Sequence, residues 1–149
     1  MKKILVTGGV GFIGTNLINR LVENGMDVFS YDDYSTGFKE NENQLATYIS
    51  GDIENIKQIS VTGFDCCVHL AAQSRVQPSF ENPDESLRVN VKGTLKVMEW
   101  AKKNNVKVVY AGSSSKHFNP SDSPYAMYKF LGEEVCKLYK KTYNLNVEI

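Results

Sequence analysis

Glycines repeat at every third position in the segment TGGVGFIG, residues 7–14. They are Gly8, Gly11 and Gly14. A glycine has no Cβ, so the backbone at these positions can approach a pyrophosphate closely, and a helix that begins there presents free N–H groups to the phosphate oxygens. We therefore expect a phosphate site in this turn, with Phe12 and Ile13 in its first helical turn.

A carboxylate follows at the spacing that dinucleotide sites use. Asp32 closes the second expected strand, 18 residues after Gly14, where it can accept hydrogen bonds from the diol of an adenosine ribose. Asp32 and Asp33 would repel a 2′-phosphate, and no arginine follows before Arg75. These residues predict a site for NAD in preference to NADP. The alternative is a tight glycine-rich turn followed by a solvated aspartate.

Two later strand ends would complete such a site. Gly51-Asp52-Ile53 ends the third expected strand, where the Asp52 carboxylate can bond an adenine amino group and Ile53 can pack on the ring. An ordinary strand-to-helix cap explains Asp52 nearly as well. The fourth strand ends in His69-Leu70-Ala71-Ala72, whose small alanines let a ribose and a phosphate lie near the backbone. We expect His69 itself to be a packed strand residue.

Tyr125 and Lys129 lie four residues apart in the last expected helix, so their side chains share one face. At roughly 6 Å and an effective dielectric near 20, the lysine charge favours a phenolate by about 2 to 3 kcal/mol, or about 2 pK units. Tyr125 is thereby a candidate base near neutral pH. Ser113, Ser114 and Ser115 follow the fifth strand. One of them can bond the substrate oxygen that Tyr125 deprotonates, unless they only cap strand carbonyls.

A parallel sheet would bring these residues to one edge. Short apolar runs alternate with longer segments of helical period, which predicts an α/β fold of one domain, residues 1–149, with a doubly wound parallel sheet of the Rossmann type. The expected strands are residues 3–7, 27–31, 47–50, 65–71 and 106–111, and residues 146–149 look like the opening of a sixth.

Capping residues set the expected helices. The first begins near Gly11 and ends before Asn24-Gly25, and the last runs from Ser123-Pro124 to about Tyr143. Another begins at Asn82-Pro83, a cap followed by proline at the first helical position. Its expected buried stripe is Leu87, Val91, Leu95 and Met98.

Composition and charge exclude several classes of protein. Lys plus Arg and Asp plus Glu are both 17, so no basic field favours nucleic acid or an anionic membrane. No apolar run approaches the 18 or more residues of a membrane span, and the first run ends too early for a signal peptide. Cys66, Cys67 and Cys136 form no CxxC pair, which favours reduced thiols over disulfides or a metal site. We expect a cytoplasmic protein.

Taken together, the motifs resemble the extended short-chain dehydrogenase/reductase family, and within it the NAD-dependent nucleotide-sugar epimerases and dehydratases such as UDP-glucose 4-epimerase. They cover essentially the whole chain in the family's order. The matching stretches are TGGVGFIG at 7–14, Asp32, Gly51-Asp52, HLAA at 69–72, NVKGT at 90–94, the serines after the fifth strand, and SPYAMYK at 123–129.

The resemblance implies that a serine, Tyr125 and Lys129 assist hydride transfer between a sugar carbon and NAD, with Ser113 or Ser114 as the serine. Tyr125 would take the hydroxyl proton, and the bound ketone would turn before hydride returns to its other face. In the 4,6-dehydratases this segment resembles Thr-Asp-Glu, which supplies an acid and a base for loss of water. Here Ser114 and Ser115 follow Ser113, so an epimerase is favoured. The alternatives are a non-catalytic NAD-binding module and a 4,6-dehydratase relative.

The resemblance also implies parts that this sequence lacks. Family members continue into a carboxyl-terminal lobe that holds the nucleotide-sugar, so we expect the NAD-binding portion alone, truncated within or after the sixth strand, with little turnover. Lys116-His117-Phe118 stands where the family has Val-Tyr-Gly. Relatives dimerise through the helices after strands four and five, and we expect a homodimer. The side chains expected outside the core for this seam are Val97, Trp100, Tyr139 and Tyr143.

Overall fold

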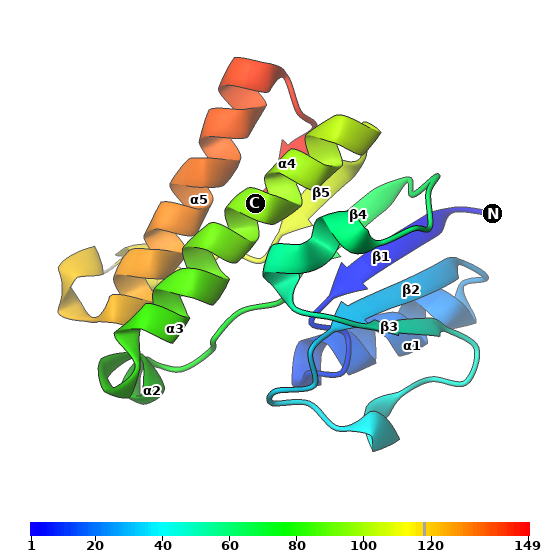
Figure 1. The fold of residues 1–149 in the computed structure, drawn as a ribbon, viewed down its shortest axis with the longest axis horizontal. Helices are drawn as coiled ribbons and strands as arrows, with labels where there is room; N and C mark the ends of the chain where they lie inside the picture. Colours follow the sequence, from blue (N-terminus) through cyan, green and yellow to red (C-terminus); the bar gives the residue numbers. More distant parts are fainter. Residues whose placement is uncertain (118) are drawn as a thin grey trace.

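The computed structural model describes residues 1–117 and 119–149, except for the side chains of residues 116 and 117. In this part of the chain, six parallel strands form one sheet in the order β3-β2-β1-β4-β5-β6 (Figure 1). They are β1 (Lys3–Thr7), β2 (Asp27–Asp32), β3 (Thr47–Ser50), β4 (Cys66–His69), β5 (Lys107–Tyr110) and β6 (Val147–Glu148). The α/β Rossmann-type fold and all six expected strands are confirmed. The strand order reverses between β1 and β4, where open parallel sheets bind ligands.

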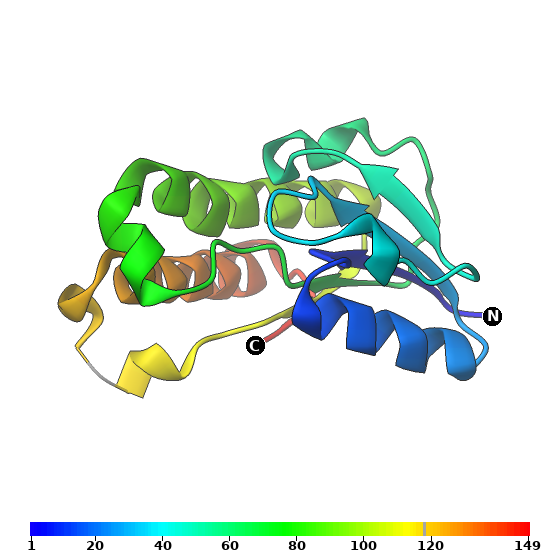
Figure 2. The ribbon, with the colours of Figure 1, turned by 90° about the horizontal axis from the view of Figure 1, so that it is seen from below.

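Both faces of the sheet are covered, which explains the nearly continuous apolar strands. On one face, Ile4 and Val6 pack with α1 (Phe12–Glu23). On the other face, Leu5 belongs to the larger core, which includes residues of the 3₁₀ segment η2 (Ile53–Gln58). Two long helices, α4 (Thr94–Asn104) and α5 (Pro124–Tyr143), complete that face. Figure 2 shows α1 and α4 on opposite sides of the sheet.

The predicted helix boundaries are confirmed by their caps. α1 ends at Glu23, Asn24 is its C-cap, and Gly25 follows at a φ of +72°, a left-handed conformation that favours glycine. The short helix α3 (Pro83–Leu87) begins after Asn82, whose side chain accepts the Glu85 N–H. Ser123 caps α5 by accepting the Ala126 N–H at 3.0 Å. No helix in the described residues is both long and apolar enough to span a membrane.

The helix that follows β4 differs from the expected one. A separate short helix, α2 (Val76–Glu81), precedes it, and a π-helical segment, Arg88–Gly93, joins α3 to α4. Met98, the last residue of the predicted buried stripe, is buried. The stripe is wrong at its other three positions, because the side chains of Leu87, Val91 and Leu95 are only half-buried.

Close approach to η2 explains this difference. A Cβ on Gly93 would lie 2.6 Å from a side-chain carbon of Ile53, so η2 leaves no room for a side chain at position 93. Polar side chains on the same face as Gly93 are buried because they find hydrogen-bond partners. The buried row is therefore Ser86, Asn90, Gly93, Thr94, Val97 and Ala101.

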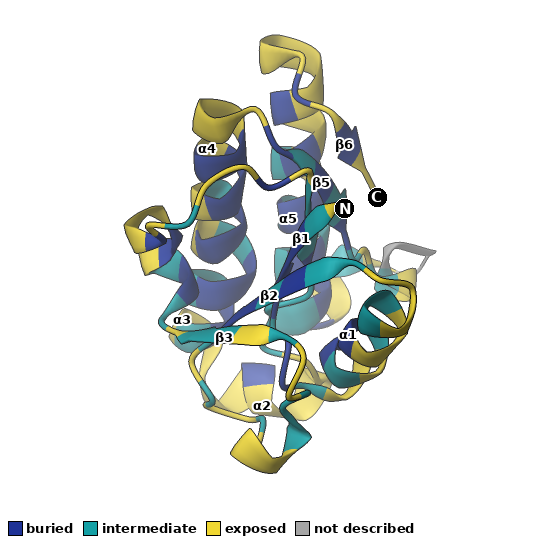
Figure 3. Ribbon diagram, turned by 90° about the vertical axis from the view of Figure 1, so that its right-hand side faces the viewer, coloured by how far each residue is buried: buried dark blue, intermediate teal, exposed yellow. Residues whose placement is uncertain are grey.

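The residues expected at a dimer seam belong largely to the core of the single chain. Val97, Trp100 and Tyr139 are 0, 6 and 4% exposed, so their predicted position outside the core is wrong. Trp100 packs on Phe64, with ring centroids 5.9 Å apart. Helical period identified the apolar face correctly, but that face packs inside the chain, where buried residues run along α4 and α5 (Figure 3). Tyr143, the fourth of these residues, is 50% exposed.

Candidate active site and cofactor site

The glycine-rich turn between β1 and α1 brings backbone segments into close contact. Gly8 has a φ of +73°, and a Cβ there would lie 2.8 Å from the Ala71 nitrogen. A Cβ on Gly14 would collide with the Gly8 carbonyl oxygen. In the described structure no side chain caps the start of α1 at Gly11. The first turn of α1 therefore keeps N–H groups available to a ligand.

Exposed apolar side chains stand beside this helix start. Phe12 and Ile13 are 87 and 63% exposed, although phenylalanine and isoleucine are usually buried. The sequence predicted both as part of a cofactor site, and their exposure at the free end of α1 is compatible with that prediction.

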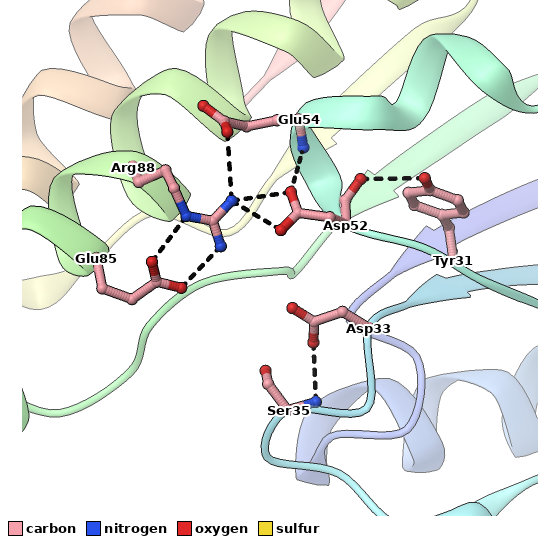
Figure 4. A network of polar contacts seen from close by, with 7 residues as sticks. All are labelled: Tyr31, Asp33, Ser35, Asp52, Glu54, Glu85 and Arg88. Atoms are coloured by element: carbon pink, nitrogen blue, oxygen red, sulfur yellow. Dashed lines mark hydrogen bonds and ion pairs between the residues drawn. The ribbon is translucent and has the colours of Figure 1, made fainter.

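Asp32 lies at the end of β2, with one carboxylate oxygen bonded to the glycine-rich turn and the other to the loop that follows β2. Its Oδ2 accepts the Val10 N–H at 3.1 Å, and its Oδ1 accepts the Tyr34 N–H at 2.9 Å. Burial raises the pKa of Asp32, and these two hydrogen bonds oppose that rise. Each oxygen keeps a further acceptor position, as a ribose diol would require. Asp33 accepts the Ser35 N–H at 2.9 Å (Figure 4).

Asp52 is both a cap and one side of an ion-pair network. Its Oδ1 accepts the Glu54 N–H at 2.9 Å, so the cap expected as the alternative is present. Arg88 Nη1 also donates to the two carboxylate oxygens of Asp52, at 2.9 and 2.7 Å. Glu85 holds the other side of the guanidinium with two bonds of 2.7 Å (Figure 4). This pairing could not be predicted from the sequence, and the contact of Asp52 with adenine stays a prediction.

His69 is buried in a directional chain of hydrogen bonds. Thr7 Oγ1 accepts the N–H groups of Leu70 and Ala71, both at 3.2 Å, so its own hydrogen is free for His69 Nδ1 at 2.7 Å. The opposite nitrogen, Nε2, then donates to Thr94 Oγ1 at 3.1 Å. Burial lowers the pKa of His69 to about 3. His69 is thus a neutral packed residue, as expected from the sequence.

Asn90, in the π-helical segment, fixes the chain that follows β4. Its Oδ1 accepts the Gln73 N–H at 2.8 Å, and its Nδ2 donates to the Gln73 carbonyl at 3.1 Å. The Asn90 carbonyl in turn accepts the Thr94 hydroxyl at 2.8 Å. The two contacts with Gln73 therefore anchor the segment that follows Ala71 and Ala72 to the π-helical segment. Residue chemistry alone did not single out Asn90, which appeared only within a motif of the family resemblance.

The start of α5 and the loop after β5 carry the expected catalytic side chains. Lys129 is buried, donates from Nζ to the Ala111 carbonyl at 2.7 Å, and lies 4.3 Å from the ring centre of Tyr110. Burial lowers the pKa of Lys129 to about 8. The backbone N–H of Tyr125 donates to Ser79 Oγ at 3.0 Å, which ties α2 to this helix.

The serines of that loop differ in their surroundings. Ser113 Oγ lies 2.7 Å from Ser115 Oγ, and the Ser113 N–H donates to Glu133 at 3.2 Å. Ser114 is exposed. The departure at residues 116–118 involves Phe118 and two side chains that lie outside the described residues.

A cavity of about 840 Å³ lies elsewhere, beside the connection from β2 to β3. None of the expected site residues lines it. Its walls include Tyr34, Lys39 and Tyr48, so we do not assign the expected chemistry to this cavity.

Residues 4–149 match the family described as the NAD dependent epimerase/dehydratase family. The chain belongs to this family. Among its relatives, a putative UDP-glucose 4-epimerase of Methanocaldococcus jannaschii is 36% identical over 98% of this chain. A UDP-glucose 4-epimerase of Mycolicibacterium smegmatis is 32% identical over 97% of it. The chain covers 53% of each of these proteins, so it spans about half the length of the curated relatives it matches.

Solved structures of family members have the same fold. UDP-glucose 4-epimerase of Thermotoga maritima, in a structure with UDP-glucose, superposes with a TM-score of 0.90 and 29% identity over 97% of this chain and 53% of that one. The Brucella ovis enzyme, in complex with NAD, also gives 0.90, with 25% identity over 99% of this chain and 50% of that one. A dTDP-glucose 4,6-dehydratase of Streptomyces venezuelae gives 0.86 with 26% identity over 97% of this chain and 53% of that one. Epimerases and dehydratases of this family therefore share the fold seen here.

Proposed function

We propose that this chain is the NAD-binding portion of a nucleotide-sugar epimerase. One observation carries the proposal: the glycine-rich turn, Asp32 and the Tyr125–Lys129 helix all lie at the carboxyl ends of the strands of one sheet. Family membership supports NAD dependence, and the relatives named UDP-glucose 4-epimerase support a nucleotide-sugar as the substrate class.

The described residues fit NAD. The absence of side chains at Gly8 and Gly14 lets the turn pack closely against Ala71 and against its own backbone, and Asp32 keeps acceptor positions for a ribose. Bound NAD would supply the acceptor and donor of hydride for a sugar carbon. The residues proposed to hold it are Gly8, Gly11, Phe12, Ile13, Gly14, Asp32, Asp33, Asp52, Ile53, Leu70, Ala71, Ala72 and Lys129.

In this proposal, Tyr125 removes the proton of a sugar hydroxyl, and Ser113 or Ser114 donates a hydrogen bond to the same oxygen. Lys129, on the same face of α5 as Tyr125, supplies a positive charge to the site. With a pKa of about 8, the Lys129 side chain is about nine-tenths charged at pH 7. Removing that proton raises the electron density at the sugar carbon from which hydride leaves.

The two alternatives differ from this proposal in testable ways. A 4,6-dehydratase needs an acid and a base for loss of water, and Ser114 and Ser115 stand where that subfamily has carboxylates. A non-catalytic module would bind NAD without turnover.

We also propose that the chain forms a homodimer and acts in the cytoplasm. Leu138 and Tyr143 on α5, 54 and 50% exposed, offer apolar surface for a second copy. Sedimentation at micromolar concentration is expected to give a species heavier than 16.7 kDa, and a monomer alone would contradict the dimer. The three free cysteines suit a reducing compartment.

Calorimetric titration with NAD and NADP tests the cofactor assignment. We expect clear preference for NAD, because a 2′-phosphate would lie beside the carboxylates of Asp32 and Asp33. Asp32→Ala should reduce this preference by weakening NAD binding, whereas Asp27→Ala, at the opposite end of β2, should leave it unchanged. Equal affinities for the two nucleotides, or binding of neither by the unmodified chain, would refute the assignment.

A further inference from the structure

One face of α5 presents three polar side chains at successive turns: Tyr125, Lys129 and Glu133. Two of them contact the loop that follows β5. Lys129 Nζ donates to the Ala111 carbonyl at 2.7 Å, and Glu133 Oε1 accepts the Ser113 N–H at 3.2 Å. The helix thus holds this loop at two points, one on each side of Gly112.

Gly112 leaves the space that the Glu133 carboxylate occupies. A Cβ on Gly112 would lie 2.8 Å from Glu133 Oε1, closer than such atoms normally approach. Glu133 is only 2% exposed, and burying a carboxylate is costly unless it is paired and hydrogen-bonded. A buried glutamate in direct contact with the Ser113 loop therefore calls for a role in the site.

The charges around Lys129 point to that role. Burial lowers the pKa of Lys129 to about 8, and Cys136 and then Glu133 oppose this fall. Burial raises the pKa of Cys136 to about 12 and that of Tyr110 well above its usual value, so both are uncharged where Lys129 titrates. His69 is neutral there as well. Glu133 lies one helical turn from Lys129 on the same face of α5, so its carboxyl group is close to the buried lysine.

We propose that Glu133 is a positioning residue, which fixes the Ser113 loop against the helix of Tyr125 and Lys129 and balances the charge of the buried Lys129 ammonium. Its purpose rests on the proposed function, because only a charged lysine favours a tyrosine phenolate. The contact of Glu133 with Ser113 and its effect on the Lys129 pKa can both be measured without NAD or substrate. Loss of the carboxylate would leave Lys129 increasingly neutral at pH 7.

The test compares Glu133→Gln with Glu133→Ala in the full chain. The Lys129 pKa is measured from the NMR shift of its labelled ε-carbon, assigned with Lys129→Arg, and the Ser113 contact from amide hydrogen exchange. Glutamine keeps an oxygen for the Ser113 N–H but removes the charge. We expect Glu133→Gln to lower the Lys129 pKa by about one unit with Ser113 still protected, and Glu133→Ala to lower that pKa and speed Ser113 exchange about tenfold.

Glu134→Gln is the matched control, because Glu134 is the next residue of α5 but is exposed and paired with Lys137 at 2.7 Å. It should change neither measurement. Gly112→Ala is a second route to the same result, since its methyl group would displace the Glu133 carboxylate while the residue itself is kept. Gly112→Ala should also lower the Lys129 pKa. If the Glu133 variants do not fold, this measurement tests the role of Glu133 in their place.

An unchanged Lys129 pKa in Glu133→Gln, or in Gly112→Ala if the former does not fold, would overturn the inference. Unprotected Ser113 in the unmodified chain would do so too. NAD titration of the unmodified chain distinguishes failure of the proposed role of Glu133 from failure of the proposed function. Failure to bind NAD refutes the proposed function and leaves the role of Glu133 beside Lys129 untouched, whereas normal NAD binding with an unchanged Lys129 pKa refutes only the role of Glu133.

Discussion

The buried His69 should make the stability of this protein depend on pH between about 7 and 3. Its side chain is 1% exposed and neutral, with one ring nitrogen accepting from Thr7 and the other donating to Thr94. The folded pKa is about 3 and the ordinary value is 6.5, so below pH 6.5 the unfolded chain binds more protons. The stability that neutral His69 contributes is therefore complete above pH 6.5 and is lost as the pH falls toward 3.

The magnitude follows from these two values. Between pH 7.5 and pH 5.0, a group with pKa values of about 3 folded and 6.5 unfolded reduces the free energy of unfolding by about 2 kcal/mol. His69→Gln removes this titration and also breaks the chain of hydrogen bonds, at a cost of about 1 to 3 kcal/mol. The variant should therefore be clearly less stable than the unmodified protein at pH 7.5 and close to it at pH 5.0.

Urea unfolding at the two pH values, followed by circular dichroism, measures the effect. The difference in unfolding free energy between the unmodified protein and His69→Gln should shrink by about 2 kcal/mol from pH 7.5 to pH 5.0. A constant difference would refute the argument.

Three further predictions concern the site. Gly14→Ala should abolish NAD binding in calorimetry and lower the melting temperature, because its methyl group would collide with the Gly8 carbonyl; binding at the original affinity would contradict the packing described. Arg88→Met should destabilise the chain by about 1 kcal/mol at pH 7 in urea unfolding. That loss should fade in acid, since Arg88 lowers the pKa of Glu85; a loss that stays constant to pH 3 would contradict the network. The chain alone should turn over UDP-sugars poorly, since positioning a substrate can contribute roughly 7 to 11 kcal/mol to catalysis; robust epimerisation that Tyr125→Phe abolishes would refute this.

Local signals in the sequence were enough to place most elements of the fold. Gly11 and the pair Ser123-Pro124 act within their own helix turns, so the starts of α1 and α5 could be predicted from neighbouring residues. The glycine-rich turn and Asp32 were predictable for the same reason, since their spacing follows from one strand, one turn and one helix. These parts depend on few residues distant in the chain.

Contacts between distant residues explain what the sequence could not predict. Arg88 pairs with Asp52 across 36 positions, and Thr94 bonds His69 across 25; neither residue type identifies its partner. Helical period located apolar faces but not the surfaces they meet, so Trp100 was assigned to the outside although Phe64 covers it. The buried row of α3, the π-helical segment and α4 contains small and polar residues because they contact partners distant in the sequence. Hydrophobicity alone would place these residues on the surface.

The π-helical segment Arg88–Gly93 makes this region sensitive to the number of residues in it. An α-helix advances about 100° per residue, so the loss of one residue within residues 88–93 would rotate α4 by that angle relative to α3. Asn90 would then part from Gln73, or Thr94 from His69. Most substitutions at an outward position such as the exposed Lys92 would leave both contacts intact. Over evolutionary time, this stretch should therefore accept changes of residue at such outward positions far more readily than single insertions or deletions.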